Sequence, residues 1–389
     1  MANTLNLGNG NWATKEDSLL AYNSENGNFK PLPFDFTRAS SATVVNKAGL
    51  IETVGSGEPR IDFSNDAKGA LLLEPTRSNL ITNSEKFVDA PIGNTNMDLF
   101  SGAITNNDTT SPNGNVTAMK FTIGGTSSSL LRIYQSDLST SSDNTFSIYA
   151  KKGTANSLSI DITDVTVVNS ILTDEWQRIS VTNTSTSSKF IDVEVLGNVG
   201  EYIYIFGLQL EQGSYATSYI PTQGSAVTRV ADVCNNGGNS TVFNSINSSG
   251  VLYFKMKRNA QSGIIASYLS ISDATANNYI SLYTYLNGNL DIDMSVGGIP
   301  QYSERNPISV TWTNLNKIAI RWKANELTFW VNGVSNTVTS IGTGLVFSSS
   351  ILSILNLGFF NGGSPNYSDY SEIKVLTYQT NEEMVALTS

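Results

Sequence analysis

Short stretches of alternating apolar and polar residues recur along this chain, and alternation with a period of two is typical of half-buried strands. In residues 317–334, one face of a predicted strand is formed by Ile318, Ile320 and Trp322. The pair Asn332-Gly333 ends this segment, and such a pair favours a type I′ hairpin because both central residues need positive φ. Residues 281–296 repeat the pattern around Asn287-Gly288. These patterns predict antiparallel strands joined by tight turns.

Helix-forming patterns are few and short. Thr14 stands three residues before Asp17, and Thr380 stands three residues before Glu383, which is the spacing of an N-cap arrangement. Each pair predicts a turn or two of helix, too little for the crossovers of a parallel sheet. We therefore predict a mainly β fold with two antiparallel β-sandwiches, of jelly-roll or lectin-like type, after an irregular N-terminal region.

Four regions follow from the distribution of these patterns. Residues 1–79 are interrupted by proline and glycine and show no sustained strand pattern. Residues 80–231 carry a first set of strands, 232–250 form a turn-rich linker, and 251–389 carry a second set. We expect the two sets to form separate sandwiches.

The first set ends in an alternating strand followed by a polar segment. We predict that one face of this last strand lies in the core and comprises Tyr202, Tyr204, Phe206, Leu208 and Leu210. Gly213 ends the strand, and Pro221 keeps the next segment extended and outside the ladder. Tyr215 and Tyr219 are expected to pack this exit along its own domain. The segment is thus predicted to be a stiff connector.

The composition indicates a folded chain and limits the classes of binding partner that are expected. Hydrophobic residues make up 40% and charged residues 14%, while Phe 16, Tyr 16 and Trp 5 supply the large buried areas that disordered segments lack. The net charge of −10 repels phosphate backbones and anionic lipid, so nucleic acid and membrane insertion are not expected. The N-terminus does not resemble a secretory signal, and no stretch approaches about 18 apolar residues. A single cysteine, Cys234, suits synthesis in a reducing cytosol.

The chain contains no histidine, which excludes Ser-His and Cys-His nucleophiles and histidine-ligated zinc. Cys234 is expected to be a structural thiol. Among the carboxylates, Asp291 and Asp293 project from one face of a predicted strand, and Asp161 and Asp164 lie close together. Neither pair is expected to flank a substrate as glycosidase acids do. Asp291 and Asp293 are weak calcium candidates, but a solvated strand face is favoured, and no cofactor is expected.

Aromatic side chains are the remaining candidates for binding. Sugars present apolar and polar surfaces, so exposed rings beside amides and carboxylates suit them. The glycan-binding candidates are Trp330, Tyr283, Tyr285, Tyr367 and Tyr370. Burial at a subunit contact is an equally good interpretation for each. Trp176 is expected to pack in a core.

Arginines recur in the N-terminal region and near the end of the connector. Arg38, Arg60 and Arg77 are expected to brace backbone carbonyls and acidic neighbours, for which Asp35, Asp62 and Glu74 are candidates. Arg229 lies at the end of the connector and is grouped with them as a structural residue. We expect a scaffold role for these side chains.

Two parts of the chain resemble a known group of proteins. The segments FTRASSATVVNKAGLIETVGSGEPRIDFSN and GALLLEPTRSNLITNSEKF resemble the N-terminal motif of a group of tailed-bacteriophage virion proteins. The segments DEWQRISVT and GLQLEQGSYATSYIPTQGSAVTRVADV resemble the end of the carbohydrate-binding-module-like sandwich that follows it there. The region with VLYFKMK and NKIAIRWKANELTFWVNGV resembles a laminin-G or concanavalin-A-like jelly roll.

The resemblance implies a non-enzymatic virion protein of fibre, tail or head-decoration type, made in the host cytoplasm. Residues 1–79 would then attach to other virion proteins, and the sandwiches would adhere to host-surface glycans. A homotrimer is expected from the resemblance and from the preference of oligomers for closed symmetry. A purely structural protein without a ligand, or a glycan depolymerase, are the alternatives.

Overall fold

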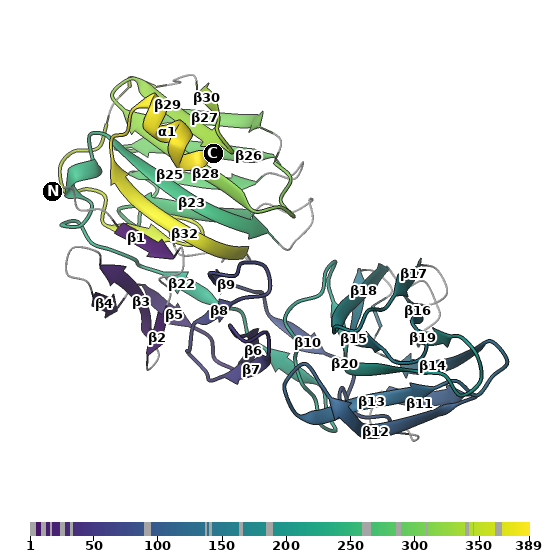
Figure 1. Ribbon diagram of the computed structural model, residues 1–389. Helices are drawn as coiled ribbons and strands as arrows, with labels where there is room; N and C mark the ends of the chain where they lie inside the picture. Colours follow the sequence, from purple (N-terminus) through teal and green to yellow (C-terminus); the bar gives the residue numbers. More distant parts are fainter. Residues whose placement is uncertain are drawn as a thin grey trace. The chain divides into compact units, whose positions relative to one another are not determined.

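The computed structural model describes residues 5–8, 13–15, 18–23, 28–31, 34–88, 95–136, 138–139, 142–162, 166–183, 190–258, 266–284, 289–308, 310–338, 342–344, 346–361 and 368–389. The chain folds into two compact units (Figure 1). Unit 1 comprises Met1–Ser41, Val54–Pro75 and Ala231–Ser389, and unit 2 comprises Ala42–Thr53 and Thr76–Val230. Both units consist mainly of antiparallel strands, so the predicted mainly β sandwich fold is confirmed.

The first sheet of unit 1, here called the β23 sheet, has the strand order β30-β29-β28-β23-β32-β9-β8, with β1 also paired to β32. Its strands are β1 (Leu5–Gly8), β8 (Arg60–Asp62), β9 (Ala70–Leu72), β23 (Gly250–Arg258), β28 (Asn316–Lys323), β29 (Glu326–Val331), β30 (Val334–Val338) and β32 (Ser368–Thr377). The predicted face of β28 is confirmed, because Ile318, Ile320 and Trp322 are all buried in the core.

The second sheet of unit 1, the β25 sheet, has the order β27-β26-β25-β24-β31. Its strands are β24 (Ala266–Ser272), β25 (Tyr279–Thr284), β26 (Leu290–Val296), β27 (Ile299–Ile308) and β31 (Ile354–Asn356). One apolar cluster joins the two sheets, since it contains Phe254 of the first and Ile292 of the second. The core of unit 1 therefore lies between them.

Smaller elements complete unit 1. They are β2 (Ala13–Lys15), β3 (Ser18–Asn23), β4 (Asn28–Pro31), β5 (Asp35–Thr37), β22 (Val233–Asn235), the 3-10 turn η1 (Asn244–Ile246) and helix α1 (Asn381–Thr388). Thr380 and Glu383 form a capping box at α1, which confirms the helix predicted there. The helical turn predicted at Thr14 is wrong, because Thr14 lies in a strand and pairs with Leu19.

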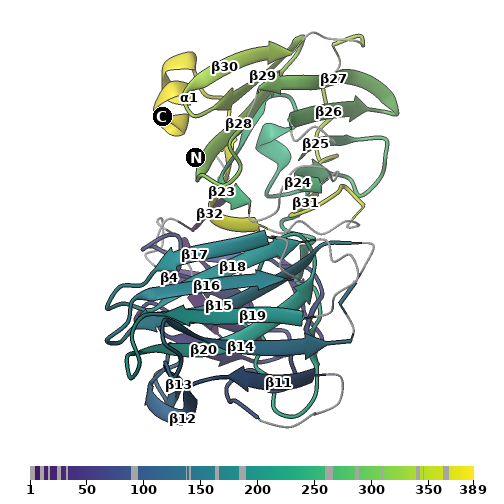
Figure 2. The same cartoon turned by 90° about the vertical axis from the view of Figure 1, so that its right-hand side faces the viewer.

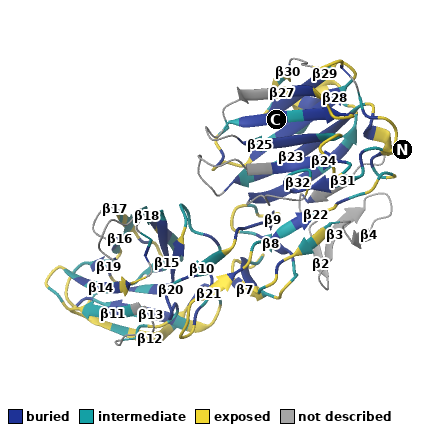
Figure 3. Cartoon of the chain, turned by 180° about the vertical axis from the view of Figure 1, so that it is seen from behind, coloured by how far each residue is buried: buried dark blue, intermediate teal, exposed yellow. Residues whose placement is uncertain are grey.

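Unit 2 is also a sandwich of two sheets, each five-stranded, whose strands can be followed in Figure 2. The β14 sheet has the order β11-β14-β19-β16-β17, and the β20 sheet has the order β12-β13-β20-β15-β18. The strands are β11 (Thr95–Phe100), β12 (Ala103–Thr110), β13 (Val116–Thr122), β14 (Ser128–Gln135), β15 (Asn144–Lys152), β16 (Ser157–Ile162), β17 (Thr166–Ile171), β18 (Gln177–Asn183), β19 (Phe190–Leu196) and β20 (Tyr202–Gln212). Figure 3 shows buried residues along the strands of each unit and exposed residues mainly in the turns.

Two further strand pairs belong to this part of the chain. They are β6 (Ala42–Val45) with β7 (Ile51–Val54), and β10 (Arg77–Asn79) with β21 (Val227–Arg229). The β6–β7 hairpin lies against the outer face of the β20 sheet, where Ile51 packs with Phe206 and Tyr219.

Strand β20 contains a bulge that corrects the predicted core face. The core residues are Ile203, Ile205, Leu208 and Leu210, so the core positions predicted for Tyr202, Tyr204 and Phe206 are wrong. The register with β15 shifts between Ser147 and Tyr149, and Gly207 has φ +65. One extra residue at Gly207 moves the later side chains to the opposite face.

The N-terminal 79 residues differ from the single irregular region expected from the sequence. They contain short strands that are divided between the units: β8 and β9 extend the β23 sheet, while β6 belongs to unit 2. Apart from β3, which has six residues, these strands have three or four residues each, too few for alternation to be recognisable. Their partners are also remote, since Leu72 pairs with Asp369.

Candidate functional site

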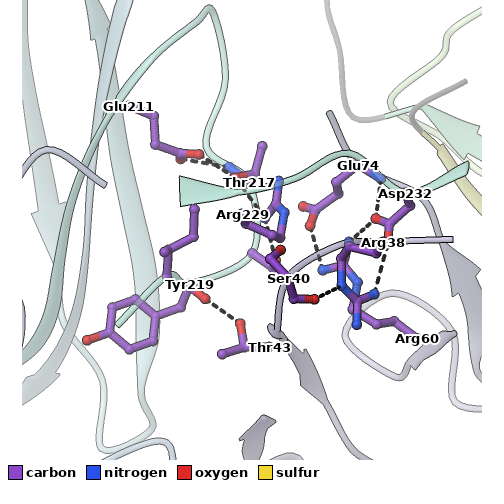
Figure 4. A network of polar contacts seen from close by, with 12 residues as sticks. Arg38, Ser40, Thr43, Arg60, Glu74, Glu211, Thr217, Tyr219, Arg229 and Asp232 are labelled. Carbon is purple, nitrogen blue, oxygen red and sulfur yellow. Dashed lines mark hydrogen bonds and ion pairs between the residues drawn. The ribbon is translucent and has the colours of Figure 1, made fainter. Parts of the chain in front are cut away.

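A buried network of two arginines and two carboxylates lies in unit 1 (Figure 4). Asp232 is its centre: one carboxylate oxygen accepts a hydrogen bond from Arg38 Nη1 at 2.9 Å. The other oxygen accepts from Arg60 Nη2 and from the backbone N–H of Glu74, the latter at 2.8 Å. The side chains of Arg38, Arg60 and Asp232 are 0% exposed.

Glu74 completes the charge balance of this network. Its carboxylate accepts from Arg60 Nη1 at 2.7 Å, and its backbone oxygen accepts from the N–H of Asp232 at 2.9 Å. Burial lowers the pKa of Arg60, but the carboxylates of Glu74 and Asp232 outweigh this and raise it above the usual value. Two guanidinium groups thus face two carboxylates in this network, so its formal charges balance.

Arg38 also binds the backbone. Its Nε donates to the Ser40 carbonyl at 2.9 Å, and its Nη2 donates to the Gly55 carbonyl at 2.5 Å. The network thus fastens separate segments of unit 1 to each other. Arg38, Arg60 and Glu74 were identified from the sequence, but Asp232 was missed. Asp232 lies at the end of the segment quoted above as GLQLEQGSYATSYIPTQGSAVTRVADV, and nothing in that segment shows which arginines it contacts.

A second polar cluster lies in unit 2 and surrounds the segment after β20. Asn79 Nδ2 donates to the carbonyls of Leu208 and Ile220 at 3.0 and 2.9 Å, and Gln209 Oε1 accepts from the Ile220 N–H at 2.6 Å. The carboxylate of Glu211 accepts from the N–H and hydroxyl of Thr217. The cluster holds the returning segment against β20.

The predicted connector residues lie in this cluster. Tyr219 is buried, and its hydroxyl lies 2.6 Å from Ser84 Oγ and 3.1 Å from Glu85 Oε1. Burial raises the pKa of Tyr219, and the Glu85 carboxylate raises it further. Arg229 Nη1 donates to Ser218 Oγ at 2.8 Å.

The other three connector residues lie nearer the surface. The guanidinium of Arg77 lies 5.4 Å from the ring centre of Tyr215. It also lies against Gly213, where a Cβ would stand 2.6 Å from Arg77 Nη2. Pro221 is half-buried and outside any strand.

The structure corrects two of the predicted glycan-binding positions. Trp330 is 5% exposed and packs in a cluster with Met384 of α1, because the C-terminal helix covers that face of β29. Tyr370 is 0% exposed and donates to the Tyr268 carbonyl at 2.5 Å. Neither ring presents a face to solvent. Tyr285 and Tyr367 lie outside the described residues.

Tyr283 and the two calcium candidates come together on the β25 sheet. The Tyr283 hydroxyl donates to Asp293 Oδ2 at 2.9 Å, and Tyr283 pairs with Asp291 in the ladder. The predicted solvated face is wrong at Asp291, which is 0% exposed. Asp161 lies on β16, and Asp164 lies outside the described residues. Within the described ranges, no group of three or more carboxylate, thiol or imidazole side chains is placed to hold a metal.

The two remaining predictions concern packing. Cys234 is buried as predicted, and burial raises the pKa of its thiol, with the carboxylates of Asp232 and Asp35 adding to the effect. Trp176 packs at the outer face of the β20 sheet and donates from Nε1 to the Thr110 carbonyl at 3.2 Å.

An aromatic and charged surface on the outer face of the β14 sheet was missed by sequence reasoning. We call it the Arg132 surface, and it comprises Asp98, Phe100, Arg132, Tyr134, Phe190 and Asp192. In β14, Leu131 and Ile133 point into the core, so Arg132 and Tyr134 point to the opposite, outer face. The other four residues lie on the same outer face of the neighbouring strands β11 and β19. The alternation in SSLLRIYQ predicts this strand, but it does not show which residues of β11 and β19 stand beside it.

Hydrogen bonds and ring contacts fix the position of the Arg132 guanidinium on this surface. Arg132 donates from Nε and Nη2 to the two oxygens of Asp192 at 2.7 and 2.5 Å. Its guanidinium lies 3.9 Å from the ring centre of Phe190 and 5.9 Å from that of Phe100. The hydrogen bond with Asp192 is the main reason why the pKa of Arg132 is raised. Phe100 is 47% exposed and Tyr134 is 37% exposed. The Arg132 side chain is 25% exposed, whereas the Asp192 side chain is 7% exposed, so the rings and the guanidinium face solvent over a buried carboxylate.

Among the helices of the described residues, none has the length and apolar character needed to cross a membrane. A scan against protein-family models found no match, and a search of curated proteins found none either.

A search of solved structures found partial similarity to carbohydrate-active proteins and a pentraxin. The chain is 14% identical to the CBM40 of the Ruminococcus gnavus IT-sialidase, with 40% of this chain and 94% of that chain covered and a TM-score of 0.31. It is 16% identical to a leech intramolecular trans-sialidase, with 40% and 26% covered and a TM-score of 0.32. It is 16% identical to a SAP-like pentraxin from Limulus polyphemus, with 36% and 70% covered and a TM-score of 0.26.

Proposed function

We propose that the protein is a non-enzymatic structural component of a tailed-phage virion that adheres to host-surface glycans through the Arg132 surface of unit 2. The virion role is supported by the sequence motifs given above. The glycan role is supported by one observation: solvent-facing aromatic rings share a rigid sheet face with a fixed guanidinium and carboxylates. Such a face matches the apolar and polar sides of a sugar.

Rigidity of the Arg132 surface favours binding. A bidentate arginine–carboxylate pair combines charge with fixed geometry, and stacking on Phe190 holds the guanidinium further. Little side-chain freedom is then lost when a ligand binds. Asp98 supplies an acceptor for sugar hydroxyls and Arg132 supplies donors, while Phe100 and Tyr134 supply stacking faces.

The buried network of unit 1 has a different part in this proposal. Arg38, Arg60 and Glu74 belong to the segments that resemble the N-terminal phage motif, and their contacts with Asp232 fasten the N-terminal part of the chain to the C-terminal sandwich. We assign it a scaffold role. The N-terminal segments would then attach the protein to another virion component.

A glycan array with purified full-length protein tests the adhesion role. We expect binding to a defined set of glycans, and at least a tenfold weaker affinity in the double variant Phe100→Ala/Tyr134→Ala, since stacking contributes about 1 kcal/mol or more per ring. Tyr378→Ala is the matched control, because Tyr378 is also 37% exposed but lies in unit 1.

Two outcomes separate the rival functions. An array without signal for the wild type favours a purely structural protein and overturns the adhesion role. New reducing ends after incubation with host capsule would instead show a depolymerase.

Immunogold labelling of purified particles tests the virion role, and label confined to the particle-free lysate would contradict it.

A further inference from the structure

The outer face of the β20 sheet carries a second aromatic surface, with a charge opposite to that of the protein as a whole. Tyr204 of β20 pairs with Lys120 of β13 on one side and with Lys151 of β15 on the other. Tyr202 lies on the same face, two residues before Tyr204. We call these four residues the Tyr204 surface.

Only part of this sheet face is covered. Next to the bulge at Gly207 the face is buried by the β6–β7 hairpin and Tyr219, which pack against Phe206 and Tyr149. Tyr202, Tyr204, Lys120 and Lys151 remain partly exposed. The bulge and the hairpin thus leave a tyrosine-rich half open to solvent.

The two rings are held in fixed positions. Their centres lie 5.4 Å apart at an interplanar angle of 68°, and the Lys120 ammonium lies 4.1 Å from the ring centre of Tyr202. The Tyr202 ring lies against Gly153, where a Cβ would stand 2.5 Å from two ring atoms. Burial raises the pKa of Tyr204 to about 12, and a hydrogen bond with Tyr202 adds to this. The Tyr204 phenol therefore stays neutral near pH 7.

Within the described residues, neither of the two lysines that flank Tyr204, Lys120 and Lys151, lies within ion-pair distance of a carboxylate, although the neighbouring Lys152 pairs with Asp174 at 3.7 Å. The carboxylate of Asp108 lies close enough to Tyr204 to contribute to its raised pKa. Acidic residues outnumber basic ones by 33 to 23 in this chain, so two such lysines in one row are a local exception. Adjacent strands are about 4.8 Å apart, which places the lysine Cα atoms roughly 10 Å apart across Tyr204.

From this arrangement we propose that the Tyr204 surface is a second saccharide site, selective for acidic sugars. A sugar ring stacks on the tyrosines, and its carboxylate or sulfate group lies between the ammonium groups of Lys120 and Lys151. The site differs in charge from the Arg132 surface, where carboxylates predominate. This proposal does not depend on the glycan-binding role proposed for the Arg132 surface, because the two surfaces share no residue and lie on different sheets.

Isothermal titration of the full-length protein with trigalacturonate and with a heparin-derived tetrasaccharide tests the proposal. We expect at least one of the two to bind, and galactotriose, the neutral counterpart of trigalacturonate, not to bind. Lys120→Gln/Lys151→Gln should weaken binding at least tenfold, and so should Tyr204→Ala. The affinity should also fall as salt rises, because the contact is partly ionic.

Lys47→Gln is the matched control, since it removes an exposed lysine of unit 2 that lies in the turn between β6 and β7 and not on the Tyr204 surface. It should leave the affinity unchanged. Thermal unfolding checks that each variant is folded. Failure of both acidic probes to bind, or binding that the lysine pair does not affect, overturns the proposal. Equal binding of inorganic phosphate would show an anion site without saccharide recognition and would also overturn it.

Discussion

Asp232 joins two guanidinium groups in the interior of unit 1, and its removal would leave them with one carboxylate. A buried ion pair gives little net stability when complete, because desolvation offsets the attraction. Breaking it is costly, since the remaining charge keeps its desolvation penalty without its partner. The network of Arg38, Arg60, Glu74 and Asp232 is therefore sensitive to any single loss of charge.

We predict that Asp232→Asn lowers the free energy of unfolding of unit 1 by about 3–5 kcal/mol. Urea denaturation followed by tryptophan fluorescence measures this change. Asp174→Asn is the control, because Asp174 is 87% exposed and pairs with Lys152 at 3.7 Å, and it should cost less than about 1 kcal/mol. Equal effects of the two substitutions would contradict a buried network.

Because the pKa of the Cys234 thiol is raised in the folded protein, we predict that the free energy of unfolding depends on pH in the alkaline range. Burial and the nearby carboxylates raise its pKa in the folded protein, whereas the unfolded thiol titrates near about 8.5. Above that pH the unfolded chain loses a proton that the folded chain keeps, so the free energy of unfolding falls as pH rises.

The free energy of unfolding should fall more steeply with pH in the wild type than in Cys234→Ala, by up to about 1.4 kcal/mol per pH unit above pH 8.5. Urea denaturation at several pH values between 8 and 10 measures both slopes. Native protein should also resist thiol reagents that modify the unfolded chain. Identical slopes in the two proteins would show that the thiol ionises equally in both states.

At the scale of elements, the bulge in β20 decides which side chains each face of the β20 sheet presents. Ile203 and Ile205 point into the core before the bulge, and Leu208 and Leu210 do so after it. Gly207 allows this because its φ of +65 is unfavourable for residues with a Cβ. Tyr202, Tyr204 and Phe206 lie on the opposite face, where Phe206 is buried by the β6–β7 hairpin and Tyr219 while the two tyrosines stay partly exposed.

Gly207→Ala should therefore cost about 1–2 kcal/mol for the left-handed backbone and a further ~1 kcal/mol for its contacts. A Cβ at this position would lie 3.2 Å from the rings of both Tyr149 and Tyr219. Gly200→Ala is the matched control, because Gly200 has φ +86 but nothing within 4 Å of its Cβ position. The difference between the two variants in urea denaturation isolates the ring contacts, and no difference would argue against them.

At the scale of the whole molecule, each unit is assembled from separated segments of the chain. Unit 1 takes strands from both ends of the sequence, and unit 2 takes a hairpin from the N-terminal region. Neither unit is thus a continuous piece of sequence. An N-terminal truncation would therefore remove sheet strands and the arginines of the buried network.

The proposed virion role predicts a closed symmetric oligomer, and a homotrimer is the expected form. Light scattering after size-exclusion chromatography of the full chain should give three times the mass of one chain at micromolar concentration. A single monodisperse species with the mass of one chain would contradict the trimer. Such a result would leave the glycan-binding surfaces to be tested separately by the arrays and titrations.

The sequence by itself determined the mainly β class, the helix at Thr380, the face of β28 and the exclusion of histidine chemistry, because these depend on neighbours or on composition. Tertiary structure alone decided the centre of the buried network, since Arg38 and Asp232 are 194 positions apart. It also decided the burial of Trp330 under α1 and the faces of Tyr202 and Tyr204 around the bulge. The two aromatic surfaces arise in the same way, from strands that come into register only when remote segments pair.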